Sequence, residues 1–558
     1  MTIGYFPHKH VQNNVASFLQ LHAFNQPEKI AFYSLPQNER TEQARHQVMT
    51  YQESNQQAGL FASSIKQLGL TFGDRVLVIL PISPELYVAI AGLQRLGVIP
   101  VLLDSLGRQE QLADILQNSQ PKAILAPQTI LGVFAPALDG YAVHIRIAID
   151  APESTETSYS FKKMIETAER EEEIVPVEQD DTALITYTTG SSGTPKGVNR
   201  THRFLSAQHY ALKRLFPYPA GAVDLPVFPV FALNNIASGI TTVIPAINIS
   251  KPTPADPLTL ISQINACGVT HMTLAPSSFK NIAVYCLANG RKLEKVARVL
   301  TGGAPISETD VERFVKIAPN SNNWILYGST EVEPISFIES RDLLTTAEAQ
   351  EVHTSAVGVN VGKIDEELHY ACIAVETGTL KDRTDLTSIS VEAGEIGELV
   401  VAGENVCEGY YNNENAFLRT KIRDAQGTVW HRTGDLARID RNGFLWIVGR
   451  KHNIIRRGDA LYFPVRPEII LRDIANVSNA AYVQSEEHTS GKIIAVVTLG
   501  ETGEQQEQQC RKEIITRFLE EALPLDAVVF LQDIPMDVRH HSKVDYGKLR
   551  KLLHELDV

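Results

Sequence analysis

Short apolar runs that alternate with helical segments constrain the fold of this chain more than any other feature. The run RVLVILPIS (75–83) ends in turn residues, PELYVAIAGLQRLG (84–97) has a helical pattern, and VIPVLLD (98–104) is again strand-like. The runs KAILAP (122–127) and VTHMTLAP (269–276) repeat the buried strand that ends in a turn. Such segments pack as a sheet layered with helices, so we expect an α/β fold that binds its ligands where strands end.

From about residue 395 the sequence pattern changes to short strand-like runs separated by glycine-containing turns. These strands lie in GEIGELVVAG (394–403), GTVWHRTGDLARID (427–440) and RNGFLWIVG (441–449). After them, an amphipathic segment, two strand-like runs and a helix over EQQCRKEIITRFLEEAL predict a compact α+β unit. We therefore expect a large N-terminal domain of layered α/β sheets with a β-rich subdomain over 1–449, and a small α+β C-terminal domain over 450–558. The hinge between them is expected at 449–453.

The net charge and the cysteine content limit which ligands, disulfide bonds and metal sites the sequence predicts. The 558 residues carry 51 basic and 65 acidic side chains, a net charge of −14, which argues against a surface devoted to nucleic acid or to anionic membrane. An anionic ligand then needs a local positive site. The 5 cysteines are scattered and odd in number, which predicts neither a disulfide framework nor a zinc site. The apolar stretches are interrupted by polar residues or prolines and predict no membrane span, and the amino terminus lacks a signal-peptide layout, so we expect a cytoplasmic protein.

The run TYTTGSSGTPKG (186–197) is a glycine- and hydroxyl-rich loop that ends in one lysine. It follows the apolar strand ALITY (183–187), and a loop of this kind can direct backbone N–H groups and hydroxyls at phosphate oxygens. The loop is not a Walker A motif, because Pro195 precedes Lys196 and Gly197 follows it. A mobile Ser/Gly linker is the alternative. The strand before the loop, and a helix expected to be capped by Thr201 after it, favour a phosphate site.

The loop resembles the phosphate-loop signature of the adenylate-forming superfamily, which includes acyl-CoA synthetases, luciferases and nonribosomal peptide adenylation domains. Further signatures of that superfamily follow in the expected order and extend the resemblance over nearly the whole chain. They are TGGAP (301–305), YGSTE (327–331), GELVVAG (397–403), HRTGDLARID (431–440), GRKHNIIRRG (449–458) and HHSKVDYGKL (540–549).

The resemblance implies a reaction that uses ATP and Mg²⁺. A substrate carboxylate would attack the α-phosphorus of ATP and give an acyl-AMP with release of pyrophosphate. The loop would clamp the β- and γ-phosphates, where charge-assisted donors are most useful. Its residues in that role are Thr188, Thr189, Gly190, Ser191, Ser192, Gly193, Thr194 and the catalytic Lys196. An exposed surface lysine is the alternative reading of Lys196.

The same resemblance assigns the rest of the nucleotide site. In YGSTE, Tyr327 would stack on adenine, Thr330 would contact the α-phosphate and Glu331 would hold Mg²⁺. The other nucleotide-binding positions would be Gly328 and Ser329 in this turn, Gly302, Gly303 and Ala304 beside the adenine, Asp435 on the ribose hydroxyls, and Arg450 on ribose or phosphate. Taken singly, these residues would be a core tyrosine, an exposed glutamate and ordinary turn residues.

The resemblance also implies a mobile C-terminal domain that brings a lysine to the reaction. Lys543 matches the family lysine that bridges the substrate carboxylate and the α-phosphate, where one cation offsets two anionic centres. A solvated lysine in a basic tail is the alternative. The domain is expected to swing after adenylation. His452 occupies the hinge position where the family usually has Asp or Lys.

The acceptor of the acyl group is the open question. The stretch FPVFALNN (228–235), with VWHRTGDL and DVRHHSKV, resembles the β-lactone synthetase branch of olefin biosynthesis, in which a β-hydroxy acyl-adenylate closes on itself. Phe231, Ala232 and Asn234 would then line the site of a medium- or long-chain acyl group, although a packed core strand is an equal reading of this stretch. Transfer to CoA, as in fatty acyl-CoA ligases, or to a carrier-protein thiol is the alternative. The expected partners are the small-molecule acid and ATP, with CoA, a carrier protein or pathway enzymes as further candidates. A non-catalytic nucleotide-binding relative is the hypothesis from another class.

Overall fold

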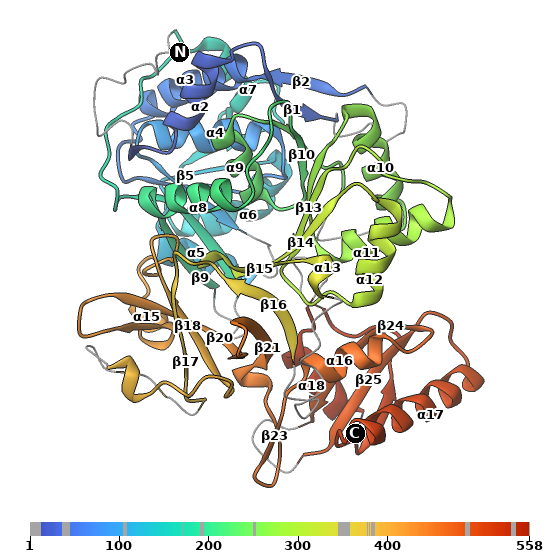
Figure 1. The fold of residues 1–558 in the computed structure, drawn as a ribbon. Helices are drawn as coiled ribbons and strands as arrows, with labels where there is room; N and C mark the ends of the chain where they lie inside the picture. Colours follow the sequence, from blue (N-terminus) through green and yellow to red (C-terminus); the bar gives the residue numbers. More distant parts are fainter. Residues whose placement is uncertain are drawn as a thin grey trace.

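The computed structural model describes residues 13–35, 45–103, 109–169, 171–189, 195–248, 253–343, 358–375, 378, 380, 385–485, 491–536 and 543–556. Within these ranges the chain forms two large sheets covered by helices and a smaller α+β unit (Figure 1). The expected α/β class is confirmed.

The first large sheet contains seven strands of the described chain, in the order β7-β6-β5-β3-β4-β8-β9. Its strands are β3 (Arg75–Val78), β4 (Ile99–Leu103), β5 (Ala123–Ala126), β6 (Ile145–Ala148), β7 (Tyr159–Ser160), β8 (Thr182–Thr189) and β9 (Pro195–Thr201), and its helices include α4 (Pro84–Arg95), α5 (Gln109–Ser119), α6 (Gln128–Gly140) and α7 (Phe161–Thr167). All neighbouring pairs are parallel except the β8–β9 hairpin. The strand–helix–strand predicted over 75–104 is therefore confirmed.

Local sequence signals explain where the helices of this region begin. Helix α3 (Tyr51–Gln67) starts at a capping box in which the Thr50 and Glu53 side chains each bond the other's backbone N–H. Helix α8 (His202–Leu215) is capped by Thr201, whose hydroxyl accepts from the N–H of Phe204, as the sequence predicts. These caps place α8 directly after the β8–β9 hairpin.

The second large sheet joins parallel strands to the β-rich segment. Its order within the described residues is β17-β18-β20-β21-β16-β15-β14-β13-β12-β10-β11-β1-β2, with β19 beside β20. The parallel part and its helices comprise α2 (Ser17–Asn25), β1 (Ile30–Ser34), β2 (Gln47–Thr50), β10 (Val223–Pro226), α9 (Pro229–Ser238), β11 (Thr241–Val243), α10 (Asp256–Cys267), β12 (His271–Leu274), α11 (Pro276–Ala288), β13 (Arg298–Gly302), α12 (Glu308–Ile317) and β14 (Asn322–Ser329). The rest comprises β15 (Val332–Glu339), α13 (Ser340–Leu343), β16 (Val359–Ile364), β17 (His369–Ile373), η2 (Leu386–Ser388), β18 (Gly397–Ala402), α15 (Glu414–Thr420), β19 (Lys421–Arg423), β20 (Val429–Ile439) and β21 (Phe444–Arg450).

One expectation for this region is wrong. Residues 228–235, for which a core strand was an equal reading, form helix α9 and its N-cap instead. Pro229 occupies the first helical turn, where its fixed φ is favourable, and Gly239 takes the left-handed conformation at the C-cap with φ +66°. These two residues define a helix even though the stretch between them is apolar and lacks a clear helical period.

The carboxy-terminal unit is a three-stranded sheet with helices, drawn from orange to red at the lower right of Figure 1. It comprises α16 (Val465–Arg472), β24 (Val477–Gln484), β25 (Ile493–Leu499), α17 (Glu504–Glu520), β26 (Ala527–Phe530) and α18 (Tyr546–Glu555). The 3₁₀ turn η3 (Lys451–Asn453) and the hairpin of β22 (Ile455–Arg457) and β23 (Ala460–Tyr462) connect it to β21. The expected domain boundary at 449–450 falls at this connection and stays a prediction.

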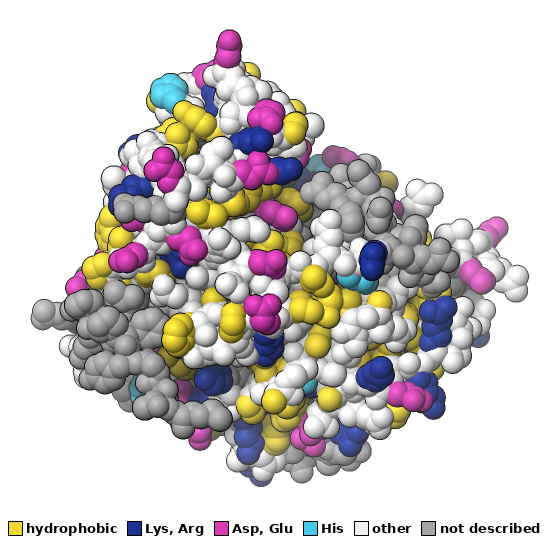
Figure 2. All heavy atoms as spheres, turned by 90° about the horizontal axis from the view of Figure 1, so that it is seen from above, with side chains coloured by type: hydrophobic (Ala, Val, Ile, Leu, Met, Phe, Trp, Pro, Cys, Tyr) yellow, Lys and Arg dark blue, Asp and Glu magenta, His cyan; other side chains and the backbone are white. Residues whose placement is uncertain are grey.

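The described surface shows no concentration of one charge on the face drawn in Figure 2, where acidic and basic side chains are interspersed. In the described ranges, no helix is both long enough and apolar enough to span a membrane.

The join between β15 and β16 generates a first prediction. Gly362 in β16 has φ +89°, and a Cβ there would overlap the backbone carbonyl of Phe337 in β15. We expect Gly362→Ala to destabilise the protein by more than about 3 kcal/mol, since a close backbone contact and a positive φ are both violated. The control Gly221→Ala, at φ +79° with no atom within 4 Å of the added Cβ, should cost only about 1–2 kcal/mol. Thermal denaturation followed by calorimetry ranks the two variants, and equal losses would contradict the steric argument.

Candidate active site

Three of the predicted nucleotide-binding residues come from three different strands and contact one another. Asp435 of β20 lies opposite Arg450 of β21 in the antiparallel register, and the Arg450 Nε lies 3.0 Å from its Oδ1. The Tyr327 hydroxyl, from β14, donates to Oδ2 of the same carboxylate at 2.7 Å. Asp435 is 8% exposed, whereas the Arg450 side chain is 43% exposed. The acceptor oxygens of Asp435 are thus oriented by two donors at the rim of the site.

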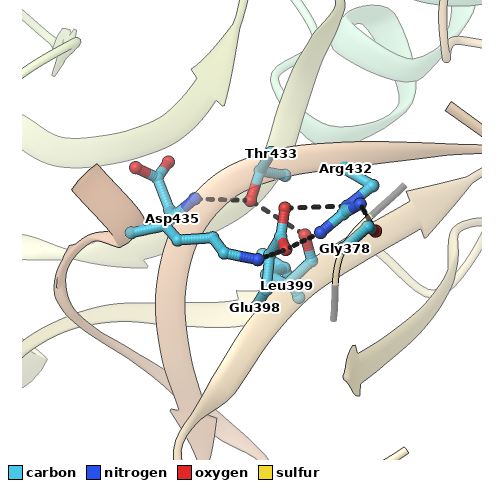
Figure 3. A network of polar contacts seen from close by, with 7 residues as sticks. Gly378, Glu398, Leu399, Arg432, Thr433 and Asp435 are labelled. Atoms are coloured by element: carbon cyan, nitrogen blue, oxygen red, sulfur yellow. Dashed lines mark hydrogen bonds and ion pairs between the residues drawn. The ribbon is translucent and has the colours of Figure 1, made fainter. Parts of the chain in front are cut away.

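A buried ion network fixes the strand that carries Asp435 (Figure 3). Arg432 and Glu398 form a doubly hydrogen-bonded pair, and the Lys451 ammonium lies 3.3 Å from Glu398 Oε2. The Thr433 hydroxyl accepts from the Asp435 N–H at 3.1 Å. Figure 3 shows the Asp435 carboxylate pointing away from this network. Tyr327 and Arg450 contact that carboxylate. The pair of Arg432 and Glu398 is almost fully buried, so its mutual bonds are needed to offset its desolvation.

The glycine-rich loop emerges from the β8–β9 hairpin. In this hairpin Thr188 pairs with Lys196, and Thr189 pairs with Pro195. The predicted residues Gly190, Ser191, Ser192, Gly193 and Thr194 lie outside the described residues. Lys196 is half-buried, and burial lowers the pKa of its ammonium while the nearby Glu331 raises it. The structure thus brings Lys196 and Glu331, 135 positions apart in sequence, into electrostatic contact.

Glu331 lies in the turn between β14 and β15, next to Thr330. Its Oε1 accepts a hydrogen bond from the Tyr410 hydroxyl at 2.9 Å. Burial opposes ionisation of this carboxyl, but the neighbouring His431 and Lys421 and the Tyr410 hydroxyl outweigh it and lower its pKa to about 2. Burial and Lys421 lower the pKa of His431 to about 3, so His431 is neutral near pH 7. Burial also lowers the pKa of Lys421, while the nearby Cys407 and Glu331 raise it.

Tyr410 and Lys421 complete this cluster, and sequence reasoning missed both. Lys421 is 3% exposed and donates to the backbone carbonyl of Cys407, while its ammonium lies 5.7 Å from the centre of the Tyr410 ring. Lys196 lies 5.9 Å from the same ring. A lysine at the start of a short strand and one of two adjacent tyrosines carry no distinctive local signal. Their importance follows from long-range contacts that only the fold creates.

The adenine side of the site depends on a close approach of two strands. A Cβ at Gly302 would overlap the backbone carbonyl of Leu326, its partner in the β13–β14 pairing, so only glycine fits there. Gly303 has φ +93° and is exposed, and Ala304 is half-buried. The turn 302–304 thus lies beside the strand end that carries Tyr327, and its role in lining the adenine stays a prediction.

The predicted acyl-site residues lie on α9. Phe231 and Ala232 are buried, and Phe231 packs with Leu300 of β13 and Leu326 of β14. The Oδ1 of Asn234 lies 2.9 Å from Nδ1 of His209 on α8. Asn234 and His209 both line a largely apolar pocket enclosed by helices α2, α4, α8 and α9. Burial lowers the pKa of His209 to about 4, so this imidazole is neutral near pH 7.

Two further predicted residues lie in and after the connection to the carboxy-terminal unit. His452 is exposed in η3, beside the buried Asn453. Lys543 is exposed and directly precedes Val544, which forms a β-bridge with Met536. Their proposed roles in hinge motion and adenylation stay predictions.

The carboxylate chemistry of the site fits a magnesium ion that is held mainly by its substrate. In the described ranges, no group of three or more His, Cys, Asp or Glu side chains forms a metal cluster. Glu331 is ionised, and its Oε1 accepts the hydrogen bond of the Tyr410 hydroxyl. Mg²⁺ is commonly bound through one or two carboxylates together with substrate phosphates, and the ionised carboxylate of Glu331 suits this arrangement.

Comparisons with known proteins agree with this geometry. The sequence profile of the AMP-binding enzyme family matches residues 19–411, so the chain belongs to this family and is an adenylate-forming acid ligase. It is 28% identical over 511 residues to an olefin beta-lactone synthetase of Stenotrophomonas maltophilia, covering 90% of each chain. It is 26% identical over 510 residues to the long-chain-fatty-acid–CoA ligase FadD13 of Mycobacterium tuberculosis, covering 87% of this chain and 90% of that one. The crystal structure of the anthranilate CoA ligase AuaEII in complex with anthranoyl-AMP superposes with a TM-score of 0.79 at 18% identity, over 100% of this chain and 99% of that one.

The geometry of Asp435 generates a second prediction. Asp435→Asn removes the charge that orients Arg450, so we expect the Kd for ATP to rise about 10-fold or more, since charge-assisted bonds are about twice as strong as neutral ones. The matched control is Asp440→Asn, a buried carboxylate at the other end of the same hairpin that accepts from Trp446 Nε1 at 2.8 Å. This control should lower Tm and leave ATP affinity unchanged. Calorimetric titration with ATP checks both variants, and equal affinities for Asp435→Asn and the unmodified protein would contradict the ribose assignment.

Proposed function

We propose that this enzyme activates a medium- or long-chain fatty acid, or a β-hydroxy fatty acid, and closes the β-hydroxy acyl-adenylate to a β-lactone. The observation that carries the proposal concerns the short segment 327–331: a nucleoside site lies at one end of it and an anion site at the other. Tyr327 contacts Asp435 at one end, and Glu331 lies beside Lys196 at the other. A nucleotide laid along 327–331 would place its ribose at Asp435 and its phosphates between the lysine and the metal carboxylate.

The residues of the chain supply binding and charge stabilisation in this mechanism. Tyr327, Asp435 and Arg450 hold the nucleoside, while Lys196 and the glycine-rich loop hold the β- and γ-phosphates. Bound Mg²⁺, held by Glu331, would neutralise phosphate charge as pyrophosphate leaves. Lys543 would join this site when the carboxy-terminal unit moves, and its cation would offset the charge of the attacking carboxylate and of the α-phosphate.

The apolar pocket lined by His209 and Asn234 supports an alkyl substrate. Its walls are aliphatic and aromatic side chains such as Leu205, Leu212 and Ile236, with few polar groups between them, as is typical of small-molecule sites. Phe231 packs against Leu212 on the side that faces strands β13 and β14. We propose that displacement of Phe231 opens the pocket toward the adenylate and admits the acyl chain.

Similarity to olefin beta-lactone synthetase supports the second half-reaction. In that step the β-hydroxyl oxygen of the acyl-AMP attacks its carbonyl carbon, the bond to the phosphate oxygen breaks, and AMP and the hydroxyl proton are released. The similarity to a long-chain-fatty-acid–CoA ligase favours a second candidate, in which the thiol of CoA attacks the same carbon. A non-catalytic relative is disfavoured, because Lys196, Glu331, Asp435, Arg450 and Lys543 are all present.

Products distinguish these candidates. The purified enzyme is incubated with ATP, Mg²⁺ and a long-chain acid, with or without a β-hydroxyl and with or without CoA, and products are identified by mass spectrometry. We expect the β-hydroxy acid without CoA to give a product lower in mass by one water, together with AMP. A thioester formed only when CoA is present would instead establish the acyl-CoA ligase.

The role of Lys543 yields a separate prediction. Lys543→Ala should lower the rate of acyl-AMP formation by at least about 100-fold while the Kd for ATP stays unchanged, because the lysine acts on charge that develops in the transition state. Lys551→Ala, which removes an exposed lysine of α18, is the matched control and should be inert. Pyrophosphate exchange measures the first half-reaction. Full activity of the Lys543 variant would sink the assignment.

A further inference from the structure

Residues 406–411, here called the bridging segment, connect the two anion-binding parts of the site. The Tyr411 N–H donates to the carbonyl of Gly197 at 2.8 Å, which ties the segment to the β8–β9 hairpin beneath the glycine-rich loop. The Cys407 N–H donates to the carbonyl of Glu331 at 2.7 Å, which ties it to the turn that carries the metal carboxylate. One short run of backbone therefore holds both parts at a set separation.

The Tyr410 side chain lies at the centre of this connection. Its hydroxyl donates to Glu331 Oε1 at 2.9 Å and accepts from the Thr420 hydroxyl at 3.3 Å. Two ammonium groups lie near its ring, with Lys196 at 5.9 Å and Lys421 at 5.7 Å from the ring centre. Cations at this distance from an aromatic face are attracted to it. The tyrosine thus contacts Glu331 through its hydroxyl and the two lysines through its ring.

The Lys421 side chain holds the bridging segment through a hydrogen bond to its backbone. Its ammonium is almost fully buried and donates to the Cys407 carbonyl, three residues before Tyr410. The buried charge is close enough to Glu331 for the two to stabilise each other electrostatically. A buried lysine kept in this position contributes a fixed bond to the backbone rather than a mobile surface charge.

We propose that Tyr410 is a positioning residue for the metal carboxylate: its hydroxyl occupies Oε1 of Glu331 and leaves Oε2 to bind the Mg²⁺ of the nucleotide complex. This inference rests on the proposed role of Glu331. A free glutamate loses rotamer entropy when it binds a metal, whereas a carboxylate already held by a hydroxyl has lost it in advance. Partners that orient metal ligands typically change metal affinity by about 10- to 100-fold when they are removed.

The same contact gives Tyr410 an effect on the phosphate loop. Lys196 lies over the Tyr410 ring, and the hydroxyl of the same side chain donates to Glu331. Tyr410 therefore couples the loop lysine to the metal carboxylate. Loss of the hydroxyl should leave the cation–ring contact in place, because the phenyl ring remains. The proposal therefore predicts a defect in metal binding that is separable from nucleotide binding.

The test compares Tyr410→Phe with Tyr411→Phe and Glu331→Gln in the full-length protein. Tyr411 is the matched control, since it lies next in the chain and packs its side chain with another core cluster. Binding of Mn²⁺ in the presence of a non-hydrolysable ATP analogue is followed by electron paramagnetic resonance, and the Mg²⁺ dependence of pyrophosphate exchange is measured in parallel. Affinity for the analogue without metal and Tm report any general loss of structure.

We expect Tyr410→Phe to weaken Mn²⁺ binding about 10-fold or more and to raise the Mg²⁺ concentration for half-maximal exchange by a similar factor. Metal-free affinity for the analogue and Tm should stay near those of Tyr411→Phe. Unchanged metal binding in Tyr410→Phe with a large loss in Glu331→Gln overturns this inference alone. Unchanged metal binding in Glu331→Gln overturns the role of Glu331 and the inference with it.

A second variant keeps the proposal testable if Tyr410→Phe does not fold. Glu331→Asp retains the charge but shortens the side chain, so one carboxylate could no longer reach both the tyrosine hydroxyl and the metal. The expected result is a loss of Mn²⁺ affinity comparable with that of Glu331→Gln. Retention of full affinity in Glu331→Asp would contradict a carboxylate positioned by Tyr410.

Discussion

The antiparallel pairing of β15 with β16 is the constraint on which the site depends. It joins the parallel strands β10 to β14 to the antiparallel strands β17 to β21 in one hydrogen-bonded sheet. Because of this join, the end of β14 with Tyr327 lies against Asp435 of β20, over 100 positions away in the chain. Gly362 permits the close approach of the two strands. Without the β15–β16 pairing, the residues expected to contact the nucleoside and the turn that carries Glu331 would not be held in fixed positions relative to each other.

Local charge around Glu331 differs from that of the whole protein. The chain has a net charge of −14, yet Lys196, Arg200 and Lys421 gather near Glu331 within the described region. Arg200 is buried and donates to the carbonyl of Thr330 at 3.0 Å. Cations kept in place by burial need little reorganisation when a polyphosphate binds, which is how preorganised sites stabilise developing charge. An anionic ligand would thus meet local positive charge in a chain whose overall charge is negative.

The two proposed parts of the active site, the nucleoside side and the acyl side, are built from different kinds of secondary structure. The nucleoside side is held by strands, with the Arg432–Glu398 pair behind Asp435. The residues expected on the acyl side lie on helices, where Phe231 belongs to one core cluster with Leu212 of α8 and Leu300 of β13. Helix packing of this kind can adjust by side-chain rotation, whereas paired strands cannot slide without loss of register. This difference fits an enzyme that keeps one nucleotide and accommodates a long alkyl chain.

The amino-acid sequence by itself determined the α/β class, the strand–helix–strand unit over 75–104 and the N-cap at Thr201. Strands such as β3 and β4, the helix between them and the Thr201 cap depend on neighbours within a few residues, so local patterns suffice. The resemblance also named Tyr327, Asp435 and Arg450, whose contact the structure then showed. The local pattern was misleading at 228–235, where an apolar run without clear period allowed a packed core strand as an equal reading, whereas Pro229 and Gly239 bound a helix.

Only the tertiary structure decided which residues surround Glu331. Tyr410 lies 79 positions from Glu331, and Lys421 lies further still, yet both contribute to the environment of its carboxylate. Neither residue type is distinctive in its own segment. Their roles arise because the bridging segment crosses between two elements whose separation is set by sheet pairing and core packing. Hydrogen bonds, buried charges and ring contacts act over a few ångströms in space, and sequence patterns reveal such neighbours only when they are also close along the chain.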